Sequence, residues 1–116
     1  MPGMLENVGG NIERYMSLLS VRQRVVASNI ANADTPGFQT KDIDFRSEFE
    51  HQMGGDLNPT TVEVSGLKTK NDGNNVDMDR EARLLAENAL RFSIASSLAR
   101  SELRSIRSAI EEGKTG

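Results

Sequence analysis

The residues able to do chemistry in this chain are few. His51 is the only histidine in the sequence, it lies in the polar run Glu50-His51-Gln52, and no cysteine is present to join it as a metal ligand or to act as a nucleophile. We therefore expect His51 to be a solvated surface side chain. The sequence predicts no catalytic site, no metal site and no bound cofactor.

Three acidic residues, Asp77, Asp79 and Glu81, stand close enough together to raise the idea of an acid–base pair or a calcium site. A calcium loop needs a sharp glycine turn that this run lacks, whereas carboxylates are stabilised at the positive end of a helix dipole. The acidic cluster thus indicates the start of a helix. The pairs Gly9-Gly10 and Gly54-Gly55 lack the spacing and flanking strand of a phosphate loop, so an enzyme is not predicted.

The element that begins at these acidic residues is a long helix, predicted over residues 77–112. Apolar residues follow one another there at alternating steps of four and three, the pattern of a heptad seam wound around a partner helix. This seam consists of Met78, Ala82, Leu85, Ala89, Phe92, Ser96, Ala99, Leu103, Ile106 and Ile110. Asp77 is placed to cap the helix and Gly113 to end it. The alternative is an ordinary surface helix of a compact domain, although such helices rarely exceed about 20 residues.

A second helix with the same spacing is predicted over residues 11–33, after a break at Gly9-Gly10 and with Asn11 as its cap. Its seam consists of Ile12, Met16, Leu19, Gln23, Val26, Ile30 and Ala33. Because two seams of one period can pair, we predict an antiparallel coiled-coil hairpin that brings Asn11 and Ile110 to the same end. The polar seam residues Gln23 and Ser96 either set the register of the pair or are simply tolerated.

Both helices also carry large aliphatic side chains on the face turned away from the predicted seams, where a two-helix hairpin in water normally keeps polar residues. These side chains are Leu18, Val21 and Val25 in the first helix and Leu90, Ile94 and Leu98 in the second. We expect neighbouring subunits to bury them. The alternative is that they are scattered exposed aliphatics, which are common on protein surfaces.

The two helices are joined by a connector over residues 34–76. Pro36 presets the first central residue of a type II turn and Gly37 can take the positive φ needed at the second, so the first helix must stop there. An extended segment and a short helix with Phe45 on its apolar face follow, and the connector continues with a possible brief strand near residues 61–64. The composition of residues 66–75 predicts a flexible loop.

Length and composition support a single all-α domain over residues 1–116. The chain is 36% hydrophobic but only 4% aromatic, which predicts a thin, linear core. Its formal charge of -3, without a basic block, disfavours binding to nucleic acid. No run of 18 apolar residues occurs, and the first seven residues lack the cationic and hydrophobic regions of a secretion signal. We expect neither a membrane span nor a cleavable signal.

The run from residue 28 to residue 38 resembles the N-terminal signature of the flagellar rod, hook and filament-axial protein family, in which asparagines precede Thr-Pro-Gly and an aromatic residue. The matching positions are Asn29, Asn32, Thr35, Pro36, Gly37 and Phe38. Residues 41–45, 75–81 and 85–92 are similar to the smallest, proximal rod subunits of that family. The resemblance covers residues 12–50 and 75–112, and the connector has no room for the large inserted domains of longer relatives.

The resemblance implies a structural protein that self-assembles with other axial proteins into the periplasmic rod of the bacterial flagellar basal body, the drive shaft that transmits torque for motility. Its implied partners are other rod subunits, the hook-basal body protein FliE, and the membrane ring with its export gate. Delivery by the flagellar secretion apparatus fits the lack of a cleavable signal. From the helical pattern alone, a soluble adaptor or chaperone-like hairpin forming a discrete dimer is the alternative.

Overall fold

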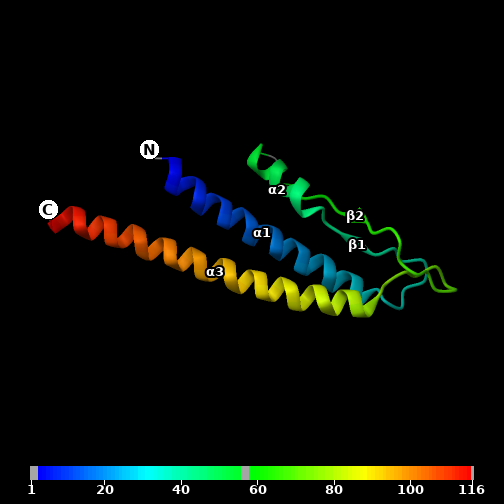
Figure 1. Ribbon diagram of the computed structural model, residues 1–116. Helices are drawn as coiled ribbons and strands as arrows, with labels where there is room; N and C mark the ends of the chain where they lie inside the picture. The colour runs from blue at the N-terminus through cyan, green and yellow to red at the C-terminus, as the bar shows by residue number, and fades with distance from the viewer. Residues whose placement is uncertain (1–2, 56–57, 116) are drawn as a thin grey trace.

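The computed structural model describes residues 3–55 and 58–115, in which three helices and two short strands are found. The helices are α1 (Gly3–Ala31), α2 (Phe45–Met53) and α3 (Met78–Thr115), and the strands are β1 (Lys41–Asp42) and β2 (Val62–Glu63). Helices α1 and α3 lie antiparallel, with both chain ends at the same end of a molecule measuring 71 × 27 × 18 Å (Figure 1). The predicted all-α hairpin is confirmed.

The loops of the connector extend past the ends of the two long helices, and its strands and short helix fold back along α1 (Figure 1). Strands β1 and β2 pair antiparallel, with Lys41 opposite Glu63 and Asp42 opposite Val62. Together with α2 they lie on the side of α1 that is opposite α3 (Figure 1). Helix α1 is therefore covered from two sides, whereas most of the surface of α3 is covered only by α1.

The N-terminal helix begins earlier than the sequence predicts, because Gly9-Gly10 does not interrupt it. Each glycine costs a helix about 1 kcal/mol relative to alanine, which neighbouring turns can offset. Gly9 also makes room for α3, since a Cβ at that position would lie 3.2 Å from Glu102 Oε1. Asn11 is consequently not a helix cap but an interior residue, whose Oδ1 accepts a hydrogen bond from Arg14 Nη1 at 3.0 Å.

The C-terminal helix is capped as predicted but ends later than predicted. The Asp77 carboxylate accepts hydrogen bonds from the backbone N–H groups of Asp79 at 3.0 Å and Arg80 at 3.3 Å, which satisfies free donors of the first turn. Gly113 does not stop α3, which continues to Thr115.

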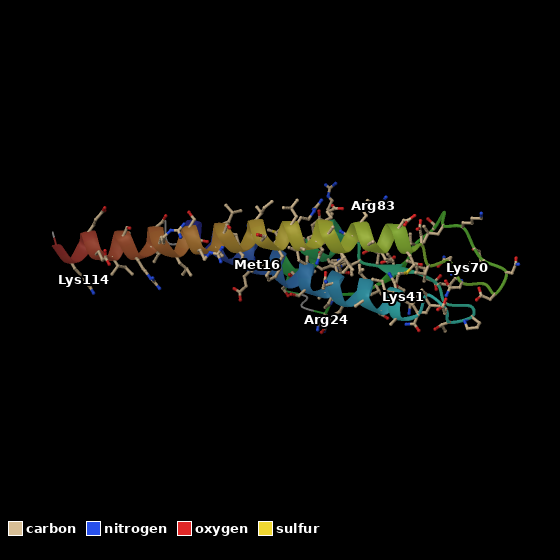
Figure 2. All side chains as sticks on the ribbon, turned by 90° about the horizontal axis from the view of Figure 1, so that it is seen from below. Met16, Arg24, Lys41, Lys70, Arg83 and Lys114 are labelled. Atoms are coloured by element: carbon tan, nitrogen blue, oxygen red, sulfur yellow. The ribbon has the colours of Figure 1, made fainter. Side chains whose placement is uncertain are left out.

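The hydrophobic core occupies only the half of the hairpin next to the turn. Its buried apolar side chains are Leu18, Leu19, Val26, Ile43, Val76, Leu84 and Ala95. No side chain described within residues 9–17 or 96–114 is buried to the same degree. We call these two halves the turn end and the terminal end. Figure 2 shows the side chains of the last turns of α3, near Lys114, projecting with no other element beside them.

Candidate assembly site

The signature run forms the turn that its sequence predicts. The backbone N–H of Phe38 donates to the carbonyl oxygen of Thr35 at 3.2 Å, and Gly37 has φ of 76°, as a type II turn requires at its second central residue. Asn32 holds the end of α1, because its Nδ2 donates to the carbonyl of Ser28 and its Oδ1 accepts from Thr35 Oγ1. Pro36 and Gly37 are both exposed.

A second loop, which immediately precedes α3, clasps this turn. The backbone N–H of Gly37 donates to the carbonyl of Asp72 at 2.9 Å. Asn74 is fully buried, and its Nδ2 donates to the carbonyls of Asn32 and Thr35 at 2.9 and 2.8 Å. The side chain of Asn75 accepts from the backbone N–H of Thr40 at 2.6 Å. Asparagine side chains here form the bonds between segments that regular structure forms through its backbone. The flexibility of residues 66–75 stays a prediction from composition.

Asn29, the first signature residue, joins three parts of the chain from a buried position. Its Nδ2 donates to the carbonyl of Lys41 at 2.8 Å and to Glu81 Oε2 at 3.2 Å, and its Oδ1 accepts from the backbone N–H of Lys41. Glu81 is completely buried, although its place in the first turn of α3 suggests only a helix-dipole role. Sequence reasoning missed this contact, because nothing in the local pattern pairs residue 29 with residue 81.

Asp42 on β1 is the centre of a group of charged side chains between the elements. Arg22 on α1 donates to it from Nε at 3.2 Å and from Nη2 at 3.1 Å, and Arg80 on α3 donates from Nη2 at 2.7 Å. Arg80 Nη1 also donates to Glu81 at 2.8 Å. These bonds fasten the connector to both long helices. No sequence spacing predicts them, because the three charged residues are 20 and 38 positions apart.

The face that α3 turns toward α1 is displaced from the predicted seam. Glu81, Leu84, Asn88 and Ala95 are buried there, each one residue before the predicted Ala82, Leu85, Ala89 and Ser96. One residue corresponds to about 100° of rotation about a helix axis. The polar contacts account for the rotation: Asn88 Nδ2 donates to the carbonyl of Leu19 at 2.9 Å and to Gln23 Oε1 at 3.0 Å. The partner of Gln23 is thus Asn88, and not Ser96.

The predicted seam residues consequently differ in burial. Leu19 and Val26 are buried, and Ile12, Met16, Ile30, Leu85 and Ile106 are half-buried. The structure corrects the prediction for Met78, Phe92, Leu103 and Ile110, which are exposed. The rotation of α3 leaves these four side chains off the buried face, with Phe92 and Leu103 lining open hollows at its border with α1.

The face opposite the predicted seam is covered in α1 and open in α3. The prediction that Leu18 contacts other subunits is wrong, because α2 and the connector cover this side of α1 and leave Leu18 with no exposed surface. Val21 and Val25 are half-buried. On α3, by contrast, Leu90, Ile94 and Leu98 are 63%, 54% and 55% exposed. We call these three residues of α3 the ridge.

Aromatic side chains of α1 and α2 lie beside the ridge. The rings of Tyr15 and Phe45 pack edge to face with centroids 5.3 Å apart. Tyr15, Phe49 and Arg91 line a hollow of about 290 Å³ together with Ile94 and Leu98. A hydrogen bond from Arg91 to the Tyr15 hydroxyl and the charge of Glu87 raise the pKa of Arg91.

A larger groove lies between the terminal ends of the two long helices. Its volume is about 550 Å³, and its apolar lining consists of Ile12, Met16, Ala99, Leu103 and Ile106. Glu13 and Glu102 also line it, and Gly9 closes it toward the chain end. We call this feature the groove. The ridge and the groove are two open apolar surfaces of α3.

Nothing in the described part of the chain is arranged for catalysis. His51 is exposed, as expected, and no group of three or more histidine, cysteine or acidic side chains among the described residues could hold a metal. The described helices are also each too polar or too short to cross a membrane. The surfaces that distinguish this molecule are therefore those that other polypeptides can cover.

Comparison with known proteins decides what kind of assembly is involved. The family described as Flagella basal body rod protein matches residues 16–39, which include the signature turn. A flagellar basal body rod protein FlgB of Escherichia coli is 34% identical, with 87% of this chain and 91% of the relative covered. The chain belongs to the FlgB family. FlgB of Proteus mirabilis is 32% identical over 94% of this chain and 97% of its own length, and FlgB of Borreliella burgdorferi is 32% identical over 80% and 87%.

Membership in the FlgB family confirms the function that the signature predicts. FlgB proteins are structural components of the flagellar basal body rod, so this chain is a structural protein of the basal body and not an enzyme. It assembles with other rod and basal body components. The comparisons give no support to an adaptor that forms a discrete dimer.

Proposed function

We propose that the chain is a proximal rod subunit whose neighbours cover the ridge, and that the resulting shaft transmits motor torque across the periplasm. The observation that carries the proposal is the ridge itself: three large aliphatic side chains in one row, each more than half exposed. Burying such side chains contributes roughly 25 cal/mol per Å² of apolar surface. Val21 and Val25 of α1, which are half-buried, are expected to add to the same contacts.

The proposal includes the neighbours and the delivery route of the subunit. Its contacts at the base of the rod would be the hook-basal body protein FliE, the membrane ring and the export gate, and the flagellar secretion apparatus would deliver it without a cleavable signal. The resemblance of residues 29–38 to the axial-protein signature supports both points. Pro36 and Gly37 are exposed at the turn and could contact a neighbour along the rod.

Placing a charge on the ridge tests the proposal. Ile94→Glu in the parent bacterium should abolish swimming and remove the subunit from purified basal bodies, because a carboxylate buried at a subunit contact lacks a partner. The matched control is Ser93→Glu, which adds the same group one position earlier on α3 at an exposed residue outside the ridge. We expect both purified variants to keep the helical circular dichroism spectrum of the parent chain.

The measurements are swimming radius and the amount of subunit per basal body. Normal incorporation of the Ile94→Glu chain would overturn the proposal that neighbours cover the ridge. An equal loss in both variants would show that any charge on α3 is harmful and would remove the special role of the ridge. If only the Ile94→Glu variant loses helicity, Ile94 is needed for folding of the single chain, and its proposed role in contacts between subunits fails.

A further inference from the structure

We propose that the ridge of one copy seats in the groove of the next copy, so that a single contact repeats from subunit to subunit. This inference rests on the proposed function and adds the identity of the partner and of the two surfaces that meet. The occupant of the groove is the α3 helix of a second copy of this chain. The shapes and charges of the two surfaces and the symmetry of a growing rod support this contact.

The shapes of the two surfaces correspond. Leu90, Ile94 and Leu98 follow one another at intervals of four, which forms a straight row of side chains of the kind that packs into the grooves of other helices. The groove runs along the adjoining flanks of α1 and α3, and its floor includes Ile12, Ala99 and Ile106. The ridge spans about 12 Å at 1.5 Å per residue, and the α3 wall of the groove, from residue 99 to residue 106, spans about 10 Å.

The charges of the two surfaces differ. The groove is lined by Glu13 and Glu102 and by no lysine or arginine of the described residues, although Leu103 on its edge also lies beside Arg100, Arg104 and Arg107. Arg91 borders the ridge, in the hollow that Ile94 and Leu98 also line, and is paired there with Glu87 at 2.6 Å. Contact between two grooves would instead bring four carboxylates together without a countercharge, which is unfavourable. Charge thus favours a ridge in the groove over two grooves face to face.

Symmetry gives the third argument. A rod grows without closing only if each copy presents two different complementary surfaces, whereas the same surface on both partners closes a dimer. The ridge and the groove are different surfaces that succeed one another along α3, the ridge over residues 90–98 and the α3 wall of the groove over residues 99–106. If all copies point the same way along the rod, Ile94 of one copy lies beside Glu102 of the next. The second copy is then shifted along the first by the length of eight helical residues. This corresponds to a stagger of about 12 Å.

Disulfide formation between introduced cysteines tests the contact directly, because the natural chain has no cysteine. The test chain carries Ile94→Cys on the ridge and Leu103→Cys in the groove. These positions are nine residues apart on one helix, about 13.5 Å, so they cannot form a bond within one copy. In basal bodies from bacteria whose only copy is the double variant, mild oxidation should yield dimers, trimers and longer ladders on a non-reducing gel.

Three other chains serve as controls. Each single variant should give no disulfide-linked species, because in the proposed contact position 94 meets position 103 and not its own copy. The matched control pairs Ser93→Cys with Leu103→Cys and moves the ridge cysteine by one residue, which turns it about 100° away from the groove. This pair should give no ladder.

Each other outcome overturns the proposal. Dimers from Leu103→Cys alone would show a closed contact between two grooves, and dimers from Ile94→Cys alone would show ridge against ridge. A linked species with the mass of a different protein would show that another component fills the groove. The double variant must first be found in basal bodies. If it is present there but gives no ladder, the ridge-to-groove contact fails while the proposed rod function stands.

Discussion

Asparagine side chains perform much of the structural work at the turn end. Asn29, Asn74 and Asn75 are buried, and each bonds to backbone groups of a distant segment. An amide side chain offers both donors and acceptors, so it can satisfy chain segments that have no strand or helix partner. The asparagines of the signature are therefore explained by their hydrogen bonds to neighbouring loops. Together with the bonds of Asn74 and Asn75, these bonds hold Gly37 against the second loop.

Gly37→Val should destabilise the turn end by about 1–2 kcal/mol, because φ of 76° places a Cβ against the backbone. No atom lies within 4 Å of the position that the Cβ would take, so the cost comes from the backbone and not from crowding. Thermal unfolding of the purified chain, followed by circular dichroism, measures the loss. Pro36→Ala should have a smaller effect, since it removes preorganisation without adding strain. An unchanged unfolding temperature for Gly37→Val would contradict the turn assignment.

At the scale of elements, the sequence predicts which segments form helices better than it predicts which faces meet. Repeats in residues 11–33 and 77–112 correctly predict two long antiparallel helices, because hydrophobic period is a local property. They do not predict that Glu81 and Asn88 face α1, because the seam is located by its apolar residues and the distant partners of these two polar side chains cannot be read from it. Across the hairpin, Glu81 bonds to Asn29, 52 residues away, and Asn88 bonds to Gln23 and Leu19, 65 and 69 residues away.

The connector likewise shows that elements are easier to predict from sequence than their packing. Its short helix and the stop at Gly54-Gly55 can be read from the sequence, but the packing of α2 against α1 cannot, because Arg22 and Asp42 carry no local sign of their pairing. This packing explains why Leu18 is buried by its own chain. The ridge on α3 was predictable because α3 has no comparable cover.

Asp42→Ala should detach the connector from the long helices. The substitution leaves the guanidinium of Arg22 without its carboxylate and removes one partner of Arg80. Both arginine side chains are largely buried, with exposed fractions of 19% and 14%. Breaking a largely buried ion pair from one side costs on the order of 3 kcal/mol. We expect a lower unfolding temperature and faster proteolysis within α2.

Glu50→Ala is the matched control for Asp42→Ala. It also removes a carboxylate that pairs with an arginine, but the pair of Arg46 and Glu50 at 3.5 Å is exposed on the surface of α2. Exposed pairs of this kind contribute little to stability. Equal unfolding temperatures for the two variants would show that the charged group around Asp42 does not hold the connector.

Among the side chains that the structure describes, the core lies at one end of the molecule. The buried apolar residues of that set lie at the turn end, within residues 18–95, whereas residues 9–17 and 96–114 of the terminal end are half-buried or exposed. Ordering a residue costs roughly 1–2 kcal/mol in backbone entropy, which burial must offset. We therefore expect folding of the terminal end to be coupled to assembly.

Amide hydrogen exchange of the isolated chain tests this coupling. Protection should be strong in α1 after residue 18 and in α3 before residue 96, and weak in both helices at the terminal end. Circular dichroism should accordingly report less helix than the structure contains, with helicity rising as concentration increases or rod partners are added. Uniform protection of α3 to residue 115, with a sharp and concentration-independent thermal transition, would contradict the expectation.

The backward fold of the connector also determines where an insertion of polypeptide would be tolerated. Helix α2 ends at Gly54-Gly55, both exposed, beside the middle of the hairpin and not beyond its turn (Figure 1). Polypeptide grafted at this bend would project sideways, leaving the length of the hairpin and the open flank of α3 unaltered. The bend is therefore the natural position for an epitope or a fluorescent label, and a chain enlarged there would thicken a shaft without lengthening its repeat.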